Sequence, residues 1–368
     1  MKTTPLHEQH LQLGAKMGEF AGYDMPLYYD EGVMAEHLWV RKHAGIFDVS
    51  HMRQIVISGA GALSFVETIT PSSYGKVPHG RAKYSVMTNE KGGIVDDLIV
   101  TKLADDKFFA VVNAGCRDKD LEWMQSHKPD DVTIECLDDR GLIALQGPDS
   151  EQVLRDVFHV DTEGMPYMWF LEANILGEKA FISRLGYTGE DGYEISVPDH
   201  ITPAVWTHLL GHGAVKPVGL AARDSLRLEM GYCLYTHDIT DETDPVSGNV
   251  GWVIGKGNEG FIGADIVRPI MEQGAEKLRV GVKLTDKGVA REGALIMNEA
   301  GEQIGVLTSG GFGPSLQQAI GQGYVPRDYA AAGTKIFVNV RGRNIAAEIA
   351  DMPFMPAKTK SMKTQQAA

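Results

Sequence analysis

Two adjacent carboxylates, Asp96 and Asp97, stand inside an apolar run that follows Gly92-Gly93 and continues to Thr101. If this run is a strand, its side chains alternate between two faces, and each carboxylate has apolar neighbours on its own face. Asp is disfavoured in strand interiors, and a carboxylate placed there must be paired, hydrogen-bonded or shifted in pKa. Such a group is a candidate for chemistry. The pattern equally allows a strand that begins after Asp97, with both acids capping the Gly-Gly turn.

A second candidate segment, 186–195, places a Gly-rich turn between two strand-like runs. Tyr187 and Tyr193 could form an aromatic wall for a flat ring, and Glu194 could hydrogen-bond to the polar edge of that ring. The commoner interpretation of Glu194 is a solvent-facing strand residue, because Glu is seldom buried unless it is paired. From the pattern alone the commoner interpretation is favoured.

Two arginines, Arg223 and Arg227, are four residues apart in a segment with helical character between Gly219 and Gly231. At that spacing they share one helix face, where arginines usually form ion pairs, for instance with Asp224 or Glu229. A functional arginine would instead offer a planar fork to a carboxylate or a heterocycle. The spacing by itself favours ion pairing.

Two motif matches lack the surroundings that their chemistry requires. The segment 255–260 fits GxGxxG, but no βαβ unit surrounds it, so we interpret it as a turn and not as a dinucleotide site. His208 and His212 lie one helical turn apart, yet they lack the Glu of HExxH, and Gly211 indicates that the helix ends there. The sequence therefore predicts no metal ligands at these positions.

The composition is that of a globular protein with more than one domain. With 368 residues, 43% hydrophobic and 23% charged, the chain is a typical globular protein of two or three domains. The formal charge of −14 argues against a general nucleic-acid surface and against binding to anionic membranes. No apolar stretch approaches 18 residues and the N-terminus has no apolar signal region, so we expect a cytoplasmic protein. Its three cysteines are irregularly spaced, which excludes a disulfide scaffold and a CxxC site.

The periodicity indicates helices and strands that alternate through most of the chain. The first 50 residues are predicted to be helical segments joined by aromatic loops, with an opening helix from Pro5 to about Met17. Short strands follow from Arg53 onward, and beyond residue 277 the pattern is nearly all strand, typical of a barrel or sandwich. This mixture indicates an α+β or α/β protein. Further helices are predicted at about 33–43, 62–70, 117–127 and 219–231.

Taken together, eight motifs in fixed order resemble one family, the T-protein of the glycine cleavage system, an aminomethyltransferase. The resemblance runs from Thr4 to about Pro356. The motifs are Phe47–Met52, Gly92–Val100, Val111–Ala114, Ala144–Pro148, Ser183–Glu194, Gly219–Leu228, Gly251-Trp252 and Thr308–Gly310.

The resemblance implies an α+β fold of three domains, arranged as a cloverleaf around a central folate cavity, with a small all-β barrel as the C-terminal domain. We accordingly expect residues 1–50 and 140–270 to form a folate-binding domain from split segments. Residues 51–139 are expected to form an α+β domain that carries Asp97, and residues 275–358 the barrel. The polar residues 359–368 are expected to be a frayed tail.

The implied activity is transfer of a methylene carbon from S-aminomethyldihydrolipoyl H-protein to tetrahydrofolate, with release of ammonia and formation of 5,10-methylenetetrahydrofolate. The implied partners are lipoylated H-protein and tetrahydrofolate, with no metal, flavin or nicotinamide. One alternative is a tetrahydrofolate-dependent demethylase of the same superfamily, acting on a sulfonium or N-methyl compound. Another is a non-catalytic folate-binding relative, which Met230–Leu234 disfavours because the Lys-Gly-Cys-Tyr-x-Gly-Gln signature is missing.

Seven site residues follow from the resemblance by position. Asp97 matches the catalytic carboxylate, which acts near N5 and N10 of the folate, where it could assist proton transfer and stabilise a positively charged iminium-like species. Glu194 and Arg223 match folate contacts. The resemblance therefore favours ligand contacts over a solvent-facing Glu194 and an ion-paired Arg223. The residues expected around the ring and the aminobenzoyl group are Met52, Tyr84, Asn113 and Tyr187.

The sequence departs from the family pattern in two places. Thr236 occupies a position that is usually Gly, and Ala357–Lys360 replaces a Tyr pair, so no folate contact is carried over there. The docking surface for H-protein and the oligomeric state are left open. A Lys/Arg patch near the cavity mouth is a hypothesis, because the lipoyl carrier is expected to be acidic and steering would be electrostatic.

Overall fold

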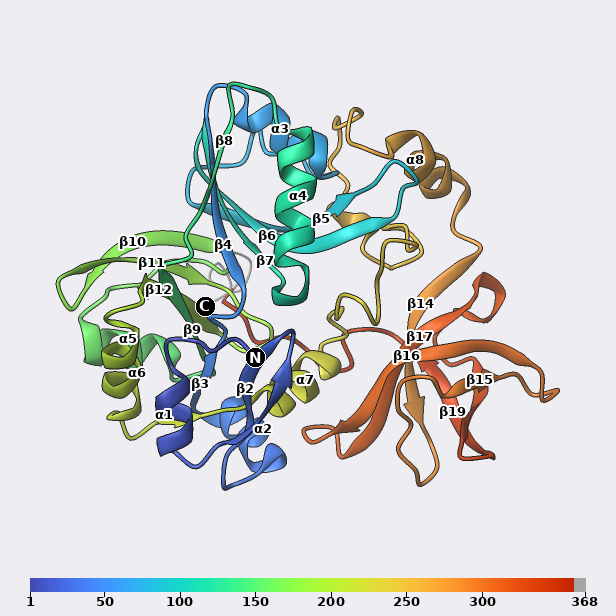
Figure 1. Cartoon of the computed structure of the whole chain (residues 1–368). Coiled ribbons are helices and arrows are strands. Elements are labelled where there is room, and N and C mark those ends of the chain that lie inside the picture. Colours follow the sequence, from blue (N-terminus) through green and yellow to red (C-terminus); the bar gives the residue numbers. More distant parts are fainter. Residues whose placement is uncertain (361–368) are drawn as a thin grey trace.

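The computed structural model describes residues 1–360, which form three parts grouped around the middle of the molecule (Figure 1). The first two parts share one 11-stranded sheet, in the order β13-β3-β9-β12-β11-β10-β5-β6-β7-β4-β8, and the third is a closed barrel. The predicted α+β class with an all-β C-terminal domain is therefore confirmed.

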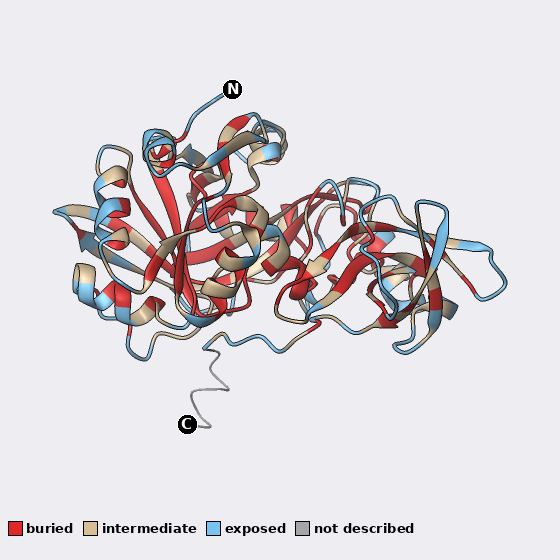
Figure 2. Cartoon of the chain, turned by 90° about the horizontal axis from the view of Figure 1, so that it is seen from below, coloured by how far each residue is buried: buried red, intermediate tan, exposed pale blue. Residues whose placement is uncertain are grey.

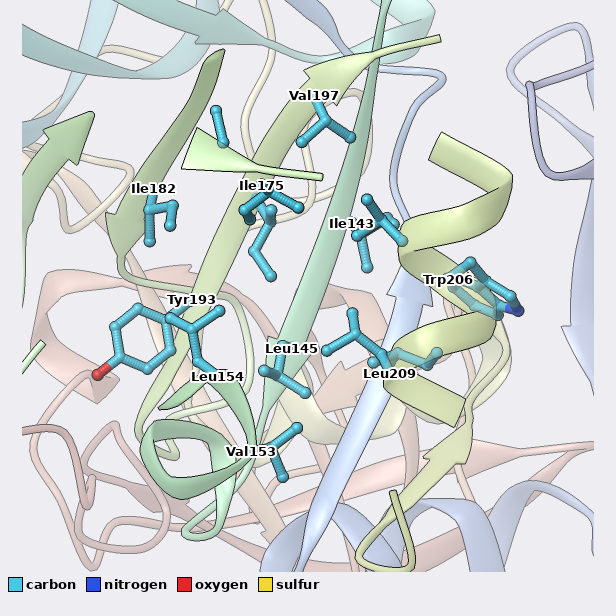
Figure 3. Packing of buried hydrophobic residues seen from close by; sticks show 14 of the residues in the cluster. Ile143, Leu145, Val153, Leu154, Ile175, Ile182, Tyr193, Val197, Trp206 and Leu209 are labelled. Atoms are coloured by element: carbon cyan, nitrogen blue, oxygen red, sulfur yellow. The ribbon is translucent and has the colours of Figure 1, made fainter. Parts of the chain in front are cut away.

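The first half of the sheet is covered by helices that bury a large apolar cluster (Figure 3). Leu145 and Ile143 of β9 pack there with Trp206 of α6 and Val153 of α5. Only β13 and β3 pair in parallel; the others pair antiparallel. The strands are β3 (Ala44–Asp48), β9 (Arg140–Gln146), β10 (Trp169–Ile175), β11 (Glu178–Arg184), β12 (Gly192–Pro198) and β13 (Val215–Pro217). The helices are α1 (His7–Gln12), α2 (Val33–Lys42), α5 (Ser150–Phe158), α6 (Thr202–Leu210) and α7 (Leu220–Glu229).

The second half of the sheet joins the first through a single residue pair, Trp169 with Arg81. Residues 255–262 pack against this half, because Gly255 N donates to Pro71 O at 2.8 Å and Ile262 N to Thr68 O at 2.9 Å. Its strands are β4 (Arg53–Ser58), β5 (Arg81–Thr88), β6 (Ile94–Ala104), β7 (Lys107–Val112) and β8 (Thr133–Cys136). Its helical segments are α3 (Ala62–Ile69), η1 (Ala114–Cys116), α4 (Arg117–His127), η2 (Gly251–Val253) and α8 (Ala264–Gln273).

The C-terminal barrel is antiparallel throughout and closes in the order β14-β17-β16-β15-β18-β19. It is tied to α7 by a buried polar contact, in which Arg227 donates to Ser309 Oγ at 2.9 Å. Asp238, in the loop after α7, accepts from Arg227 at 2.7 Å and from Ser309 Oγ at 3.0 Å. Its elements are β14 (Lys277–Leu284), β15 (Leu295–Met297), β16 (Gln303–Gly313), β17 (Gln318–Pro326), η3 (Arg327–Tyr329), β18 (Lys335–Val340) and β19 (Arg343–Ala350).

The prediction that the first 50 residues are helices joined by loops is wrong in two places, because β3 is a strand and a hairpin follows the first helix. The opening helix ends at Gln12 and does not reach Met17, which lies in a hairpin formed by β1 (Lys16–Phe20) and β2 (Tyr23–Tyr28). Gly14 has φ +71°, a left-handed conformation that stops a helix at no steric cost. The helices predicted near 33–43, 62–70, 117–127 and 219–231 are confirmed as α2, α3, α4 and α7.

Buried residues concentrate along the sheet and inside the barrel (Figure 2). Across residues 1–360, no helix combines the length and the apolar character needed to cross a membrane. The end of the described chain contacts the first part, since Lys358 N donates to Gly189 O at 2.7 Å and Tyr167 N to Lys360 O at 2.8 Å. Residues 361–368 of the expected tail lie outside the described residues, and the expected domain boundaries stay a prediction.

Candidate active site

Asp97 lies within β6, which begins at Ile94, so the alternative in which both acids cap the Gly-Gly turn is wrong. Its carboxylate is half-buried and accepts two hydrogen bonds, from Tyr84 Oη to Oδ2 at 3.0 Å and from Asn113 Nδ2 to Oδ1 at 2.7 Å. Burial and the neighbouring Asp96 charge raise the pKa of Asp97 to about 7. A carboxyl group with that pKa exchanges protons near neutral pH.

Asp96 precedes Asp97 on β6 and is fully buried. Asn113 reaches both acids, because it follows β7, whose last residue, Val112, pairs with Leu98 of β6. Its backbone N donates to Asp96 Oδ2 at 3.1 Å and its Nδ2 to Asp96 Oδ1 at 2.9 Å. Asn113 therefore links the fully buried Asp96 to the half-buried Asp97.

A second group of predicted residues comes from the first half of the sheet. The guanidinium of Arg223, on α7, lies 4.8 Å from the ring centroid of Tyr187, and the Tyr187 hydroxyl donates to the carbonyl of Cys233. Glu194, on β12, is only 7% exposed, so the interpretation as a solvent-facing residue is wrong. The structure brings these three predicted residues together.

Glu194 and Arg223 are charged groups without partners among residues 1–360. No donor there bonds to the carboxylate of Glu194, and Arg223 Nη1 is buried with no acceptor. Burial raises the pKa of Glu194 and lowers the pKa of Arg223, and each charge offsets only part of the other's shift. Two desolvated charges left unbonded are suited to hold a polar ligand.

The ion pairing expected of the two arginines holds for one of them. Arg227 pairs with Asp224 at 2.8 Å and with Asp238 at 2.7 Å. Arg223 has no carboxylate within 4.0 Å in the described part of the chain, so that interpretation of Arg223 is wrong.

The two groups of residues meet at aromatic rings around Cys233. Tyr84 packs in the apolar cluster that contains Cys233, whose carbonyl is bonded to Tyr187. The ring of Trp252 stacks on Tyr84 with centroids 5.5 Å apart, although Trp252 itself is 70% exposed. Tyr232 stacks on Tyr187 with centroids 5.7 Å apart. Asp97 with Tyr84 and Asn113 forms one group, and Glu194 with Arg223 and Tyr187 forms the other. The rings of Tyr84 and Tyr187, on either side of Cys233, form an aromatic boundary between the two groups.

Met52, also predicted, is half-buried in the apolar cluster that joins the two halves of the sheet. Its neighbour His51 was not singled out by the sequence. His51 is 4% exposed, its Nδ1 has no partner among residues 1–360, and burial with the nearby Arg223 and Arg117 charges lowers its pKa to about 4. The neutral imidazole is a further polar group open to a ligand.

A buried group of three potential ligand atoms was also missed. Asp96, Cys116 and Asp120 bring one carboxylate or sulfur atom each to within 4.8 Å of one another. The spacing gave no signal, because Asp118 and Asp120 look like the acids that commonly occupy the first turn of a helix.

The GxGxxG match and the His208/His212 pair are not arranged as a dinucleotide site or a metal site in the described part of the chain. The segment 255–260 lies in a loop between η2 and α8, as the turn interpretation predicts. Helix α6 ends at Leu210, His208 Nδ1 lies 2.7 Å from Ala204 O, and His212 Nε2 lies 3.5 Å from Asp156.

Comparison with known proteins gives matches along nearly the whole chain. Residues 6–258 match the GCVT N-terminal domain, and residues 277–355 match the glycine cleavage T-protein C-terminal barrel domain. The chain is 40% identical over 360 residues to an aminomethyltransferase of Chloroherpeton thalassium, covering 96% of this chain and 99% of that protein. It is 41% identical over 382 residues to a mitochondrial aminomethyltransferase of Dictyostelium discoideum, covering 98% and 94%.

A solved structure agrees with this. The crystal structure of glycine cleavage system aminomethyltransferase T from Bartonella henselae superposes with a TM-score of 0.94 at 40% identity, covering 98% of this chain and 99% of that one. The fold and the matches define the class of protein as a group-transfer enzyme, an aminomethyltransferase. More narrowly, the chain belongs to the glycine cleavage T-protein family. The predicted family and enzyme class are confirmed.

Proposed function

We propose that this protein transfers the methylene carbon of an S-aminomethyl group, carried on the lipoyl arm of H-protein, to tetrahydrofolate with release of ammonia. The observation that carries the proposal is the pair Glu194 and Arg223, two desolvated charges without partners among the described residues, beside the ring of Tyr187. They stand across an aromatic boundary from Asp97, whose pKa of about 7 suits proton transfer.

The residues present fit tetrahydrofolate. A pterin is a flat ring with N–H donors and a carbonyl on its edge, so the carboxylate of Glu194 would accept from its N–H groups. The guanidinium of Arg223 offers a fork of donors for a carbonyl or a carboxylate, and the rings of Tyr187 and Tyr84 would cover apolar faces. Met52 and Asn113 would complete the surroundings of the ring and the aminobenzoyl group.

The reaction needs proton transfer but no oxidant. One C–S bond and one C–N bond of the aminomethyl group break, and two C–N bonds to the folate nitrogens form. The two protons lost by those nitrogens are balanced by the thiol and the ammonia that leave. Asp97, held by Tyr84 and Asn113, would accept a proton from one nitrogen and return it to a leaving group. As a carboxylate it would also stabilise positive charge that develops on the transferred carbon.

The remaining expectations stay predictions. They comprise the cytoplasmic location, the basic docking patch for H-protein, and the absence of metal, flavin and nicotinamide. A basic patch would make the association of the two proteins weaker as salt rises. Salt-independent association would contradict it.

The test is to measure ammonia and 5,10-methylenetetrahydrofolate after mixing the protein with aminomethylated H-protein and tetrahydrofolate. We expect both products to form only when both substrates and the protein are present. Omission of each substrate in turn is the control, and tetrahydrofolate binding is measured separately by calorimetry. Tetrahydrofolate binding without product formation would contradict the proposed donor and favour a methylated small molecule.

A further inference from the structure

Asp120, in the first turn of α4, is an acid that nothing in the proposed reaction uses. It is fully buried, and no N–H or O–H group of residues 1–360 donates to either of its carboxyl oxygens. A carboxylate ion cannot stay charged in such a place without a partner, so the group must be neutral or share a proton.

Asp96 is the neighbouring acid that can accept a hydrogen bond from a protonated Asp120. One oxygen of each lies within 4.8 Å of the other, and Asp96 is also fully buried. The two differ in their donors, because Asp96 accepts from both the backbone N and the side-chain Nδ2 of Asn113. Hydrogen bonds from N–H donors favour the ionised form, so Asp96 holds the charge and Asp120 the proton. Burial and the Asp96 charge raise the pKa of Asp120 to about 11, which agrees.

The other ionisable groups nearby do not change this assignment. Lys119 is on the same helix, and its ammonium donates to Val95 O, to the hydroxyl of Tyr235 and to Asp241. Its charge lowers the pKa of Asp120, but less than burial and Asp96 raise it. Burial raises the pKa of the Cys116 thiol, so that group is neutral. The charge of Asp97 raises the pKa of Asp120, in the same direction as the charge of Asp96. A metal ion would need the thiolate and the Asp96 oxygens that Asn113 already occupies, so a proton fits better.

We propose that Asp120 is a positioning residue, a neutral carboxylic acid that donates its O–H to Asp96 and so fixes the chain of contacts Asp96–Asn113–Asp97. Asn113 uses Nδ2 for both acids, at 2.9 Å to Asp96 and 2.7 Å to Asp97. If Asp96 turned away or became protonated, Asn113 would lose its anchor, and the orientation of Asp97 would be lost with it. This inference rests on the proposed role of Asp97.

The test compares Asp120→Asn with Asp120→Ala. Asn has the same shape and keeps an N–H donor toward Asp96, but it does not titrate. We expect Asp120→Asn to keep kcat within about threefold of wild type and to keep the pH profile, whereas Asp120→Ala lowers kcat about tenfold or more and moves the apparent pKa of kcat/KM. Equal losses in both variants, or an unchanged pH profile in Asp120→Ala, would overturn the proposal.

A second measurement does not depend on activity. The infrared difference spectrum of wild type minus Asp120→Asn at pH 8 should show the C=O band of a protonated carboxyl group, because surface carboxylates are ionised there. Absence of that band, or a stoichiometric metal ion that Asp120→Asn no longer binds, would overturn the proposal. If wild type formed no 5,10-methylenetetrahydrofolate, the proposed function would fail while the infrared result still decided the state of Asp120.

Discussion

Tyr84 donates its hydroxyl hydrogen to Oδ2 of Asp97 at 3.0 Å, across the pairing of β5 with β6. This bond favours the ionised carboxylate and lowers the pKa of Asp97, whereas burial and the Asp96 charge raise it, with a result of about 7. The ionised form is therefore lost as the pH falls through about 7, and an activity that needs the carboxylate declines on the acid side.

Tyr84→Phe removes that donor and leaves the ring in place against Trp252. We expect the apparent pKa on the acid limb of kcat/KM to rise by about one unit, because a hydrogen bond to a charged group contributes roughly 1.5–3 kcal/mol. Activity at pH 7 then falls several-fold and recovers at higher pH. The measurement is the pH profile of kcat/KM. Tyr193→Phe, which loses a hydroxyl bonded to Thr162 at 2.7 Å, is the matched control and should leave the profile unchanged. A Tyr84→Phe profile that matches wild type would contradict this account of the Asp97 pKa.

Arg223→Ala and Arg227→Ala should separate ligand binding from stability. Arg223 has no ion pair among the described residues, so its loss should weaken tetrahydrofolate binding about tenfold or more and leave thermal stability close to wild type. Arg227 is bonded to Asp238, which is fully buried, and removing it should destabilise the fold by about 3–5 kcal/mol. Calorimetric titration with tetrahydrofolate and thermal unfolding of both variants measure the two effects. Unchanged affinity in Arg223→Ala would return that residue to a structural role.

Glu194→Ala should also weaken tetrahydrofolate binding, and Glu194→Gln should restore only part of it. Gln keeps one carbonyl acceptor but loses the charge, and a charge-assisted hydrogen bond is roughly twice as strong as a neutral one. Burial raises the pKa of Glu194, so removal of the charge should not lower the stability of the folded protein. Titration calorimetry with tetrahydrofolate measures the affinities. Affinity equal to wild type in both variants would remove Glu194 from the ligand contacts.

Thr236→Gly should stabilise the protein. Thr236 has φ +74°, a left-handed conformation that costs a residue with a Cβ about 1–2 kcal/mol, and Gly avoids that cost. After the greater flexibility of Gly in the unfolded chain is counted, we expect a net gain of about 1 kcal/mol. Thr236→Ala is the control, because it keeps the Cβ and should gain little. Thermal unfolding that ranks Thr236→Gly at or below wild type would contradict the argument.

The sequence predicts well what depends on local pattern. The stretches near 33–43, 62–70 and 117–127 are helices, as the periodicity predicts, whereas the pattern left open whether Asp96 and Asp97 lie in the strand, which the structure decides. It predicts poorly what depends on distant partners. Arg223 and Arg227 share one helix face, but only Arg227 meets Ser309, which the barrel brings to α7, and Asp238, which the loop after α7 brings there. The local pattern gives Arg227 one acid three residues away, Asp224, but it does not show that Arg223 is left without a pair among the described residues.

The missed residues are explained in the same way. Asp120 looks like an ordinary acid near the start of a polar helix, and only packing against β6 and η1 buries it beside Asp96. The apolar residues around Gly14 fit a helix as well as a hairpin, and the left-handed φ of Gly14 decides between them. The resemblance supplied Glu194 and Arg223 as site residues, where periodicity alone favoured a surface Glu and an ion-paired Arg.

The central claim, that Asp97 acts in the chemistry and not in folate binding, is tested most directly by Asp97→Asn. The measurement is product formation from aminomethylated H-protein and tetrahydrofolate, with the affinity for tetrahydrofolate determined in parallel. We predict a loss of turnover of about 10²-fold or more with an affinity within about threefold of wild type. Turnover close to wild type would contradict the claim and remove Asp97 from the chemistry.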